Sequence, residues 1–272
     1  MRALVRTYTL TGLVLTLVGF PLYWMVVTSL KPQTEIFAMP PSWVPRTWTS
    51  LHYRELFVLT DFLQLFVNSL KVCLLSTGIS LVVGTLGAYA LARCRVRGKE
   101  LYGRSVLLAY MFPGALLIIP LVLLFSRLGL TDSHLGLALA YITFTLPFVM
   151  WVLRGFFRNV PVEMEEAALI DGCSRLGALW NVVLPQAMPG ILATGIFAFL
   201  FAWNEYLFAL ILISDESLRT LPPGMMRFLS ATDVNWGLMM AASVLVTLPM
   251  AVVFGFVQRY LVTGIGAGGV TG

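Results

Sequence analysis

The chain has 272 residues, of which 58% are hydrophobic and only 11% are charged, and its formal net charge is +5. Soluble domains spend about a quarter of their residues on Asp, Glu, Lys and Arg. This composition, with a mean hydropathy of +0.87, therefore excludes an ordinary soluble domain and indicates an integral membrane protein.

Six gaps between charged residues are long enough to cross a bilayer, whose ~30 Å core needs roughly 20 apolar residues in a helix. In chain order they run from Arg6 to Lys31, Lys71 to Arg93, Arg104 to Arg127, Asp132 to Arg154, Leu176 to Ser214 and Asp233 to Arg259. The fifth contains Glu205, and its membrane portion is expected to begin near Gln186. The first is about 24 residues long without an A-x-A site after it, which indicates an uncleaved span rather than a signal peptide.

The distribution of Lys and Arg predicts the orientation, because cytoplasmic loops are enriched in them. Eleven of the 18 lie on the side of the termini: Arg2, Arg6, Arg93, Arg95, Arg97, Lys99, Arg104, Arg154, Arg158, Arg175 and Arg259. Seven lie on the longer loops of the other side: Lys31, Arg46, Arg54, Lys71, Arg127, Arg219 and Arg227. Both termini are therefore expected in the cytoplasm. The basic net charge follows from this bias, so it does not indicate nucleic-acid binding.

The sequence thus predicts one all-α domain, residues 1–272, that crosses the cytoplasmic membrane six times. Residues 1–64 are expected to form the first span and an outer segment, residues 65–262 a core of five spans, and residues 263–272 a tail.

Motifs for catalysis or cofactor binding are missing from the sequence. The glycines of GIGAGG, residues 264–269, follow an apolar helix and precede only three residues, so they cannot form a dinucleotide-binding turn. A Walker-type G-x-x-x-x-G-K-[ST] does not occur, so the chain by itself is no P-loop ATPase. His52 and His134 lie far apart without metal-ligand spacing. A membrane-bound enzyme is disfavoured, and we expect neither metal nor cofactor in this chain.

Residues 159–185, between the fourth and fifth gaps, form a polar segment on the predicted cytoplasmic side. Pro161 suits the first position of a helix, and the following glutamates would meet the positive end of its dipole. Gly172 is expected to cap this helix, and Ser174 to begin a second one that ends by Pro185. The pattern predicts a helical hairpin without DNA-binding character.

This segment resembles the EAA loop of ABC-type importer permeases, whose pattern is E-A-A, three residues, G, nine residues, I, one residue, L-P. The matching residues are Glu166, Ala167, Ala168, Gly172, Val182 in place of Ile, Leu184 and Pro185. Four other stretches resemble signatures of carbohydrate permeases: NSLKV (68–72), LGAYALAR (86–93), FAWNEYLFALILI (201–213) and QRYLVTGIGAGGVTG (258–272). Together they are similar to the second, maltose MalG-like subunit type and imply a type I importer (MetI-like) permease fold.

The resemblance implies that the loop couples the spans to a cytoplasmic ATPase. The residues to which the resemblance assigns this role are Glu165, Glu166, Ala167, Ala168, Asp171, Gly172, Leu184 and Pro185. Implied partners are a homologous permease in a heterodimer, two ATPase subunits that hold ATP and Mg, and an extracytoplasmic solute-binding protein. The implied substrate is an oligo- or disaccharide of the maltose or trehalose type, moved by alternating access.

Trp203, Asn204, Glu205 and Tyr206 form a second candidate site inside the fifth span. A carboxylate in the bilayer costs about 2.5 to 3.5 kcal/mol on insertion scales, so it usually faces the bundle interior or a water-filled cavity. Either these residues border the sugar path, because aromatic faces, carboxylates and amides bind sugars, or Glu205 pairs with a neighbouring helix and shapes the bundle.

Two other transport functions remain as alternatives. The coupling loop is shared with ABC permeases for polyamines, phosphate esters or glycerol phosphate, although no Lys or Arg is expected inside a span to favour a phosphorylated substrate. An ion-coupled secondary transporter typically needs ionisable relays in the membrane, and one glutamate without an internal repeat disfavours it.

Overall fold

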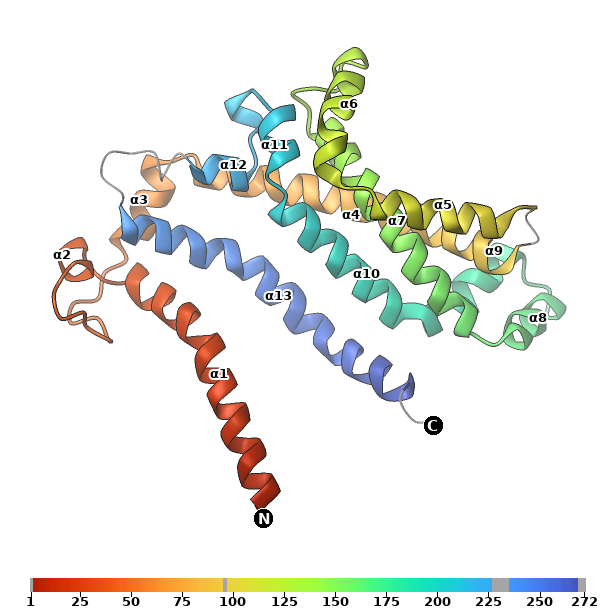
Figure 1. Cartoon of the computed structure of the whole chain (residues 1–272), viewed down its shortest axis with the longest axis horizontal. Helices are drawn as coiled ribbons and strands as arrows, with labels where there is room; N and C mark the ends of the chain where they lie inside the picture. Colours follow the sequence, from red (N-terminus) through yellow and green to blue (C-terminus); the bar gives the residue numbers. More distant parts are fainter. Residues whose placement is uncertain (1, 95–96, 227–234, 269–272) are drawn as a thin grey trace. The chain divides into compact units, whose positions relative to one another are not determined.

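A computed structural model describes residues 2–94, 97–226 and 235–268, and helices are the only regular secondary structure in these ranges (Figure 1). Five helices are long and apolar enough to cross a membrane: Arg6–Ser29, Phe62–Arg93, His134–Asn159, Arg175–Asn204 and Trp236–Gln258. Lys99–Met111 and Gly114–Arg127 pass the same test together but are bent by 98°. The prediction of an all-α membrane protein is confirmed, with six spans if the bent pair counts as one.

The chain forms two compact units, of which the first comprises residues 1–66 and 224–251. It contains α1 (Arg2–Ser29), α2 (Gln33–Ile36), α3 (Leu51–Leu59) and the first part of α13 (Trp236–Gly268). His52 of α3 is buried, and its Nε2 lies 2.9 Å from the carbonyl oxygen of Lys31. Gly237 of α13 packs against the same imidazole. His52 therefore joins three segments of this unit by packing.

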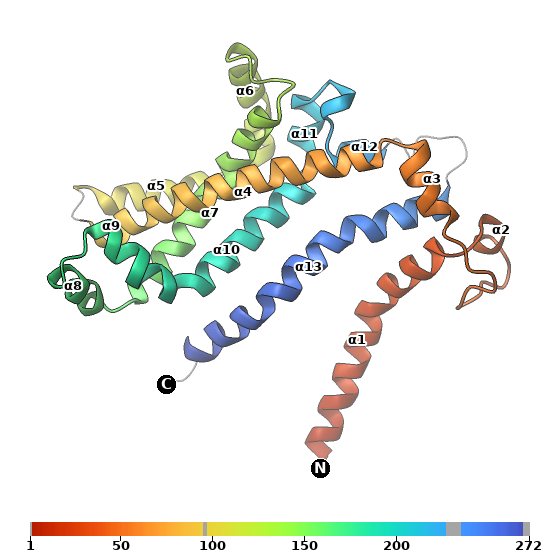
Figure 2. The ribbon, with the colours of Figure 1, turned by 180° about the vertical axis from the view of Figure 1, so that it is seen from behind.

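The second unit comprises residues 67–223 and 252–272, and α7 (His134–Asn159) packs against several of its helices (Figure 2). Its neighbours include α4 (Phe62–Arg93), α5 (Lys99–Met111) and α10 (Leu184–Asn204). Small residues allow these helices to approach closely, since Gly84 of α4 lies against Val149 of α7 and Gly190 of α10 against Phe156. Residues 269–272 of the expected tail lie outside the described residues.

The third predicted span is not one straight helix. It divides into α5 and α6 (Gly114–Arg127) at Phe112, whose backbone is extended, with a ψ of 129° (Figure 1). Phe112 precedes Pro113, and a proline disfavours the helical conformation in the residue before it. The third apolar stretch is therefore helical over most of its length, but Pro113 interrupts the helix within it.

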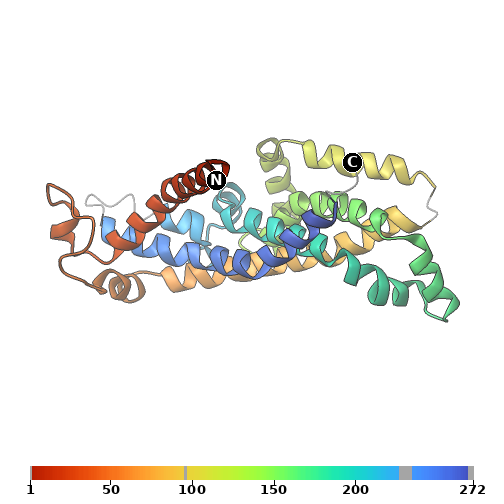
Figure 3. The ribbon, with the colours of Figure 1, turned by 90° about the horizontal axis from the view of Figure 1, so that it is seen from below.

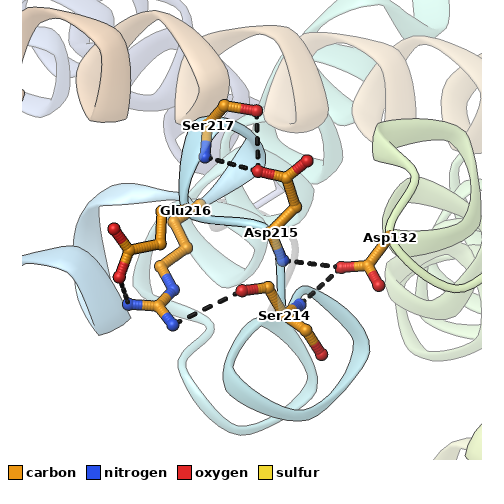
Figure 4. A network of polar contacts seen from close by, with 6 residues as sticks. Asp132, Ser214, Asp215, Glu216 and Ser217 are labelled. Atoms are coloured by element: carbon orange, nitrogen blue, oxygen red, sulfur yellow. Dashed lines mark hydrogen bonds and ion pairs between the residues drawn. The ribbon is translucent and has the colours of Figure 1, made fainter.

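Loops that were predicted on the outer side contact one another in the second unit (Figure 4). One Asp132 carboxylate oxygen accepts hydrogen bonds from the N–H groups of Ser214, at 2.5 Å, and Asp215, at 2.8 Å. Asp215 in turn accepts from the hydroxyl and backbone of Ser217, and these hydrogen bonds hold the pKa of the Asp215 carboxyl below its usual range. The α6–α7 turn is thus fastened to the segment after α11 (Leu207–Leu212).

Segments that were predicted in the cytoplasm also contact one another. Glu100, at the start of α5, accepts a hydrogen bond from Arg154 at 2.8 Å and pairs with Arg158 at 3.3 Å, both near the end of α7. Arg93, at the end of α4, pairs with Glu165 of the polar segment. The contacts therefore join loops that the charge distribution places on the same side.

Candidate functional site

The polar segment forms the expected hairpin at one end of the second unit (Figure 3). Helix α8 (Val162–Ile170) is terminated by the turn at Gly172, which has a φ of +91°, and the N–H of Cys173 donates to the carbonyl of Ala168 at 2.9 Å. The Ser174 side chain accepts from the N–H of Gly177 at 3.1 Å and begins α9 (Arg175–Ala178). Both predicted caps are confirmed. We call residues 159–185 the coupling hairpin.

The predicted end of its second helix is wrong, because the chain continues through Leu184 and Pro185 into α10 as one apolar run, Arg175–Asn204. Residues Leu179–Val183 form a π-helix, η1, and the N–H of Leu184 bonds to the carbonyl of Leu179, five residues back. Proline lacks an N–H and clashes with the carbonyl four residues before it in an α-helix. The wider π turn directly before Pro185 relieves that conflict, so the proline need not end the helix.

The two glutamates of the motif point to different surroundings. Glu165 is buried with 5% exposure, whereas Glu166 and Ala167 are exposed. The Tyr89 hydroxyl donates to Glu165 Oε1 at 2.5 Å, and Arg93 Nε lies 3.1 Å from Glu165 Oε2. Sequence reasoning did not identify Tyr89 and Arg93 as functional residues. The available signal was their spacing of four within LGAYALAR, which places them on one face of α4.

The solvent-facing surface of the coupling hairpin exposes apolar side chains near Glu166, Asp171 and Gly172. Ile170 is 85% exposed and Trp180 is 66% exposed. The other large apolar side chains exposed on the hairpin are Val162, Met164 and Leu176. Val162, Met164 and Ile170 belong to α8, which lies outside the candidate spans, and exposed apolar side chains on such a polar segment are typical of a protein-binding surface.

A cleft of about 680 Å³ opens where two spans are interrupted. Phe112 lines it at the break between α5 and α6, and Asn204, Glu205 and Tyr206 line it at the break between α10 and α11. Irregular backbone at membrane depth is tolerated where it lines a cavity, and transporters use such broken helices for binding. The aromatic side chains of the wall are Tyr110, Phe112, Phe144, Phe197, Phe201 and Phe208.

The predicted residues of the fifth span do not all face this cleft. Glu205 has an extended backbone, and its carboxylate accepts hydrogen bonds from the N–H groups of Phe208, at 3.0 Å, and Ala209, at 3.1 Å. Tyr141 of α7 is a further hydrogen-bonding partner of this carboxylate. Trp203 is buried at 3% exposure and stacks on Phe199 instead. Glu205 therefore lines the cleft and also holds the start of α11.

Comparisons with known proteins identify relatives over nearly the whole chain. A sequence profile of the family "Binding-protein-dependent transport system inner membrane component" matches residues 80–266, more than half of the chain. The inner membrane ABC transporter permease protein YcjP of Escherichia coli (strain K12) is 38% identical over 96% of this chain and 93% of its own length. The diacetylchitobiose uptake system permease protein DasC of Streptomyces coelicolor is 36% identical, over 93% of this chain and 92% of its own.

A more distant relative and a solved structure agree with these matches. The trehalose/maltose transport system permease protein MalG of Thermococcus litoralis is 32% identical, over 93% of this chain and 91% of its own length. A chain in the crystal structure of a bacterial ABC transporter that imports the acidic polysaccharide alginate superimposes with a TM-score of 0.82. That match covers 94% of this chain and 95% of the other, and at 22% identity it supports the fold alone.

Proposed function

Because the chain belongs to the family of binding-protein-dependent transport system inner membrane components, we propose that it is the permease subunit through which an ATP-driven importer passes a saccharide. Relatives that share most of its length and carry a substrate in their names are permeases for sulfoquinovosyl glycerol, for diacetylchitobiose and for trehalose and maltose. A small saccharide or glycoside is the substrate class that these names support for this chain.

The single observation that carries the coupling role is the exposed face of α8 with the apolar side chain of Ile170, which is 85% exposed. The sequence has no Walker motif, so energy has to enter from another chain. We assign this face, with Glu166, Ala167 and Gly172, to a groove on a cytoplasmic ATPase subunit. ATP and Mg are then held by the two ATPase subunits and not by this chain.

The substrate path is proposed at the cleft between the broken spans. Its aromatic wall suits the apolar faces of sugar rings, and Asn204, Glu205 and Tyr206 supply hydrogen-bonding groups beside that wall. The cleft has no lysine or arginine among its lining residues, which disfavours a phosphorylated or otherwise anionic substrate. Its volume of about 680 Å³ lies within the range of small-molecule sites.

Alternating access is the transport mechanism that we propose for this arrangement. Closure of the ATPase subunits displaces the coupling hairpin, and the attached spans open the path toward the outside. There a solute-binding protein releases sugar over the outer loops around Asp132 and Ser214. A homologous permease completes the path from the other side. A likeness to a chain of an alginate transporter crystallised with a loaded periplasmic protein, at a TM-score of 0.66, is consistent with the external partner.

Reconstituted transport tests the proposal. The complex is purified through an affinity tag on this chain, its copurifying subunits are identified, and it is placed in proteoliposomes with its binding protein. Uptake of labelled maltose, trehalose and diacetylchitobiose is compared with uptake of glycerol phosphate and putrescine. We expect ATP-dependent uptake of one of the sugars. Uptake that is driven by an ion gradient without ATP, or that is confined to glycerol phosphate or putrescine, would contradict the proposal.

A further inference from the structure

A buried polar cluster distant in sequence from the cleft residues links the coupling hairpin to α4. It consists of Tyr89 and Arg93 of α4 and Glu165 of α8, and we call it the α4 clamp. Tyr89 and Glu165 are each 5% exposed, and the Arg93 side chain is 8% exposed. Both carboxylate oxygens of Glu165 are engaged, one by a hydrogen bond from the Tyr89 hydroxyl at 2.5 Å and the other by an ion pair with Arg93 Nε at 3.1 Å, which is not aligned as a hydrogen bond.

The α4 clamp also reaches the hairpin on both sides of α8. The Arg93 guanidinium donates to the carbonyl of Val160, in the residue pair that links α7 to α8. The Tyr89 hydroxyl lies 3.4 Å from the carbonyl oxygen of Arg175, the first residue of α9. One turn of α4 therefore holds the beginning, the middle and the second helix of the hairpin.

Burial of these groups favours a mechanical role over a docking role. A carboxylate that is 5% exposed and engaged at both oxygens has no surface left for a partner chain, whereas the neighbouring Glu166 is exposed. A buried ion pair often adds little net stability compared with apolar residues of the same volume. Charge-assisted hydrogen bonds do, however, fix direction and distance closely.

We propose that Tyr89 and Arg93 are positioning residues that lock the coupling hairpin to α4 through Glu165, so that α4 moves with the hairpin. In this arrangement Glu165 connects α8 to α4 within the chain, and the exposed residues beside it contact the ATPase subunit. The inference rests on the proposed function, because it takes the hairpin as the point where ATP-driven movement enters.

The first test compares coupling in proteoliposomes that contain the whole complex. The variants are Glu165→Gln, Tyr89→Phe and Arg93→Lys, and the matched control is Glu163→Gln, an equal charge change on the exposed side of α8. We expect the three variants to keep their ATPase subunits and to hydrolyse ATP, while sugar taken up per ATP falls about tenfold, the equivalent of one lost charge-assisted hydrogen bond. The control is expected to keep the wild-type ratio.

The second test replaces the α4 clamp by a covalent link. Cys73, Cys94 and Cys173 are first removed, and Arg93→Cys with Glu165→Cys is joined by a short, reducible bis-methanethiosulfonate reagent. Sugar uptake per ATP is expected to recover when the link forms and to fall again on reduction. A wild-type ratio in the first three variants, loss of ATPase subunits from Glu165→Gln, or a link that restores nothing would each overturn the proposal. Failure of the wild-type complex to take up sugar would instead contradict the proposed function.

Discussion

At the scale of single residues, Glu165 and Glu166 show how neighbours in one motif serve different tasks. Glu165 turns inward to Tyr89 and Arg93, and Glu166 faces solvent beside Ala167. Successive residues of an α-helix are about 100° apart, so one of two adjacent glutamates can be buried while the other stays exposed. The sequence motif alone does not distinguish them.

Gly172 provides a residue-scale prediction, because its φ of +91° is costly for any side chain although open space surrounds the position of a Cβ. We expect Gly172→Ala to destabilise the hairpin by about 1 to 2 kcal/mol and to lower ATP-driven uptake. Gly155→Ala is the matched control, since Gly155 also has open space but lies inside helix α7. Thermal unfolding of the purified protein measures both. Equal melting temperatures for the two variants would contradict the strain argument.

Glu205 offers a second prediction, which separates its support of α11 from a role toward sugar. Glu205→Ala leaves the N–H groups of Phe208 and Ala209 without their acceptor, at about 1 to 3 kcal/mol for each buried group. Glu205→Gln keeps an acceptor oxygen for only one of the two N–H groups, so it is expected to unfold at a temperature between those of the wild type and Glu205→Ala and to raise the KM for sugar uptake. Wild-type KM in a stable Glu205→Gln would assign the residue to the support of α11 alone.

At the scale of elements, the features that were predictable are those with a local cause. Gly172 and Ser174 mark caps through their own backbone chemistry, and long gaps between charges mark spans because the bilayer excludes charge. The α4 clamp was not predictable, since Tyr89 and Glu165 lie 76 positions apart and only tertiary packing brings them together. The path through Pro185 was missed because the preceding π-helix has no local sequence signal.

The break between α5 and α6 leads to an element-scale prediction. Pro113→Ala removes the restriction on Phe112, so we expect helix to extend across the break and the cleft beside it to narrow. Amide hydrogen exchange at residues 112–116 is expected to slow, and sugar uptake to fall. The matched control is Pro120→Ala, which changes a proline inside α6 and away from the break. Unchanged exchange at residues 112–116 in Pro113→Ala would show that packing, and not the proline, maintains the bend.

At the scale of the whole molecule, topology connects the two ends of the second unit to two compartments. The outer contacts of Asp132 and the inner contacts of Arg93 and Arg154 involve different loops, and each set agrees with the bias of Lys and Arg. The membrane class followed from composition, since a chain with 11% charged residues cannot cover a soluble surface, whereas the spans followed from the gaps between charges and the permease fold from the resemblance. The substrate class could not be derived from composition, because the cleft forms only where two broken helices meet in the fold.

A labelling experiment tests this topology. Native Cys173 lies in the coupling hairpin and is partly exposed, whereas Ser214 lies in the outer loop. In a background without Cys73 and Cys94, a membrane-impermeant maleimide added to intact cells is expected to label Ser214→Cys. Cys173 is expected to react only after the membrane is permeabilised. Labelling of Cys173 from outside would reverse the assigned orientation.

The passage of η1 into α10 without a stop has a mechanical consequence. The chain changes direction between α9 and α10 (Figure 2), and α10 itself has 21 residues, so at helical rise it extends roughly 31 Å from the hairpin to the break at Glu205. A helix of that length turning by about 5° around one end carries the other end through roughly 3 Å. A small rotation at the ATPase would thus be enlarged at the cleft. If the helix ended at Pro185, the movement of the hairpin would not be transmitted to the cleft in this way.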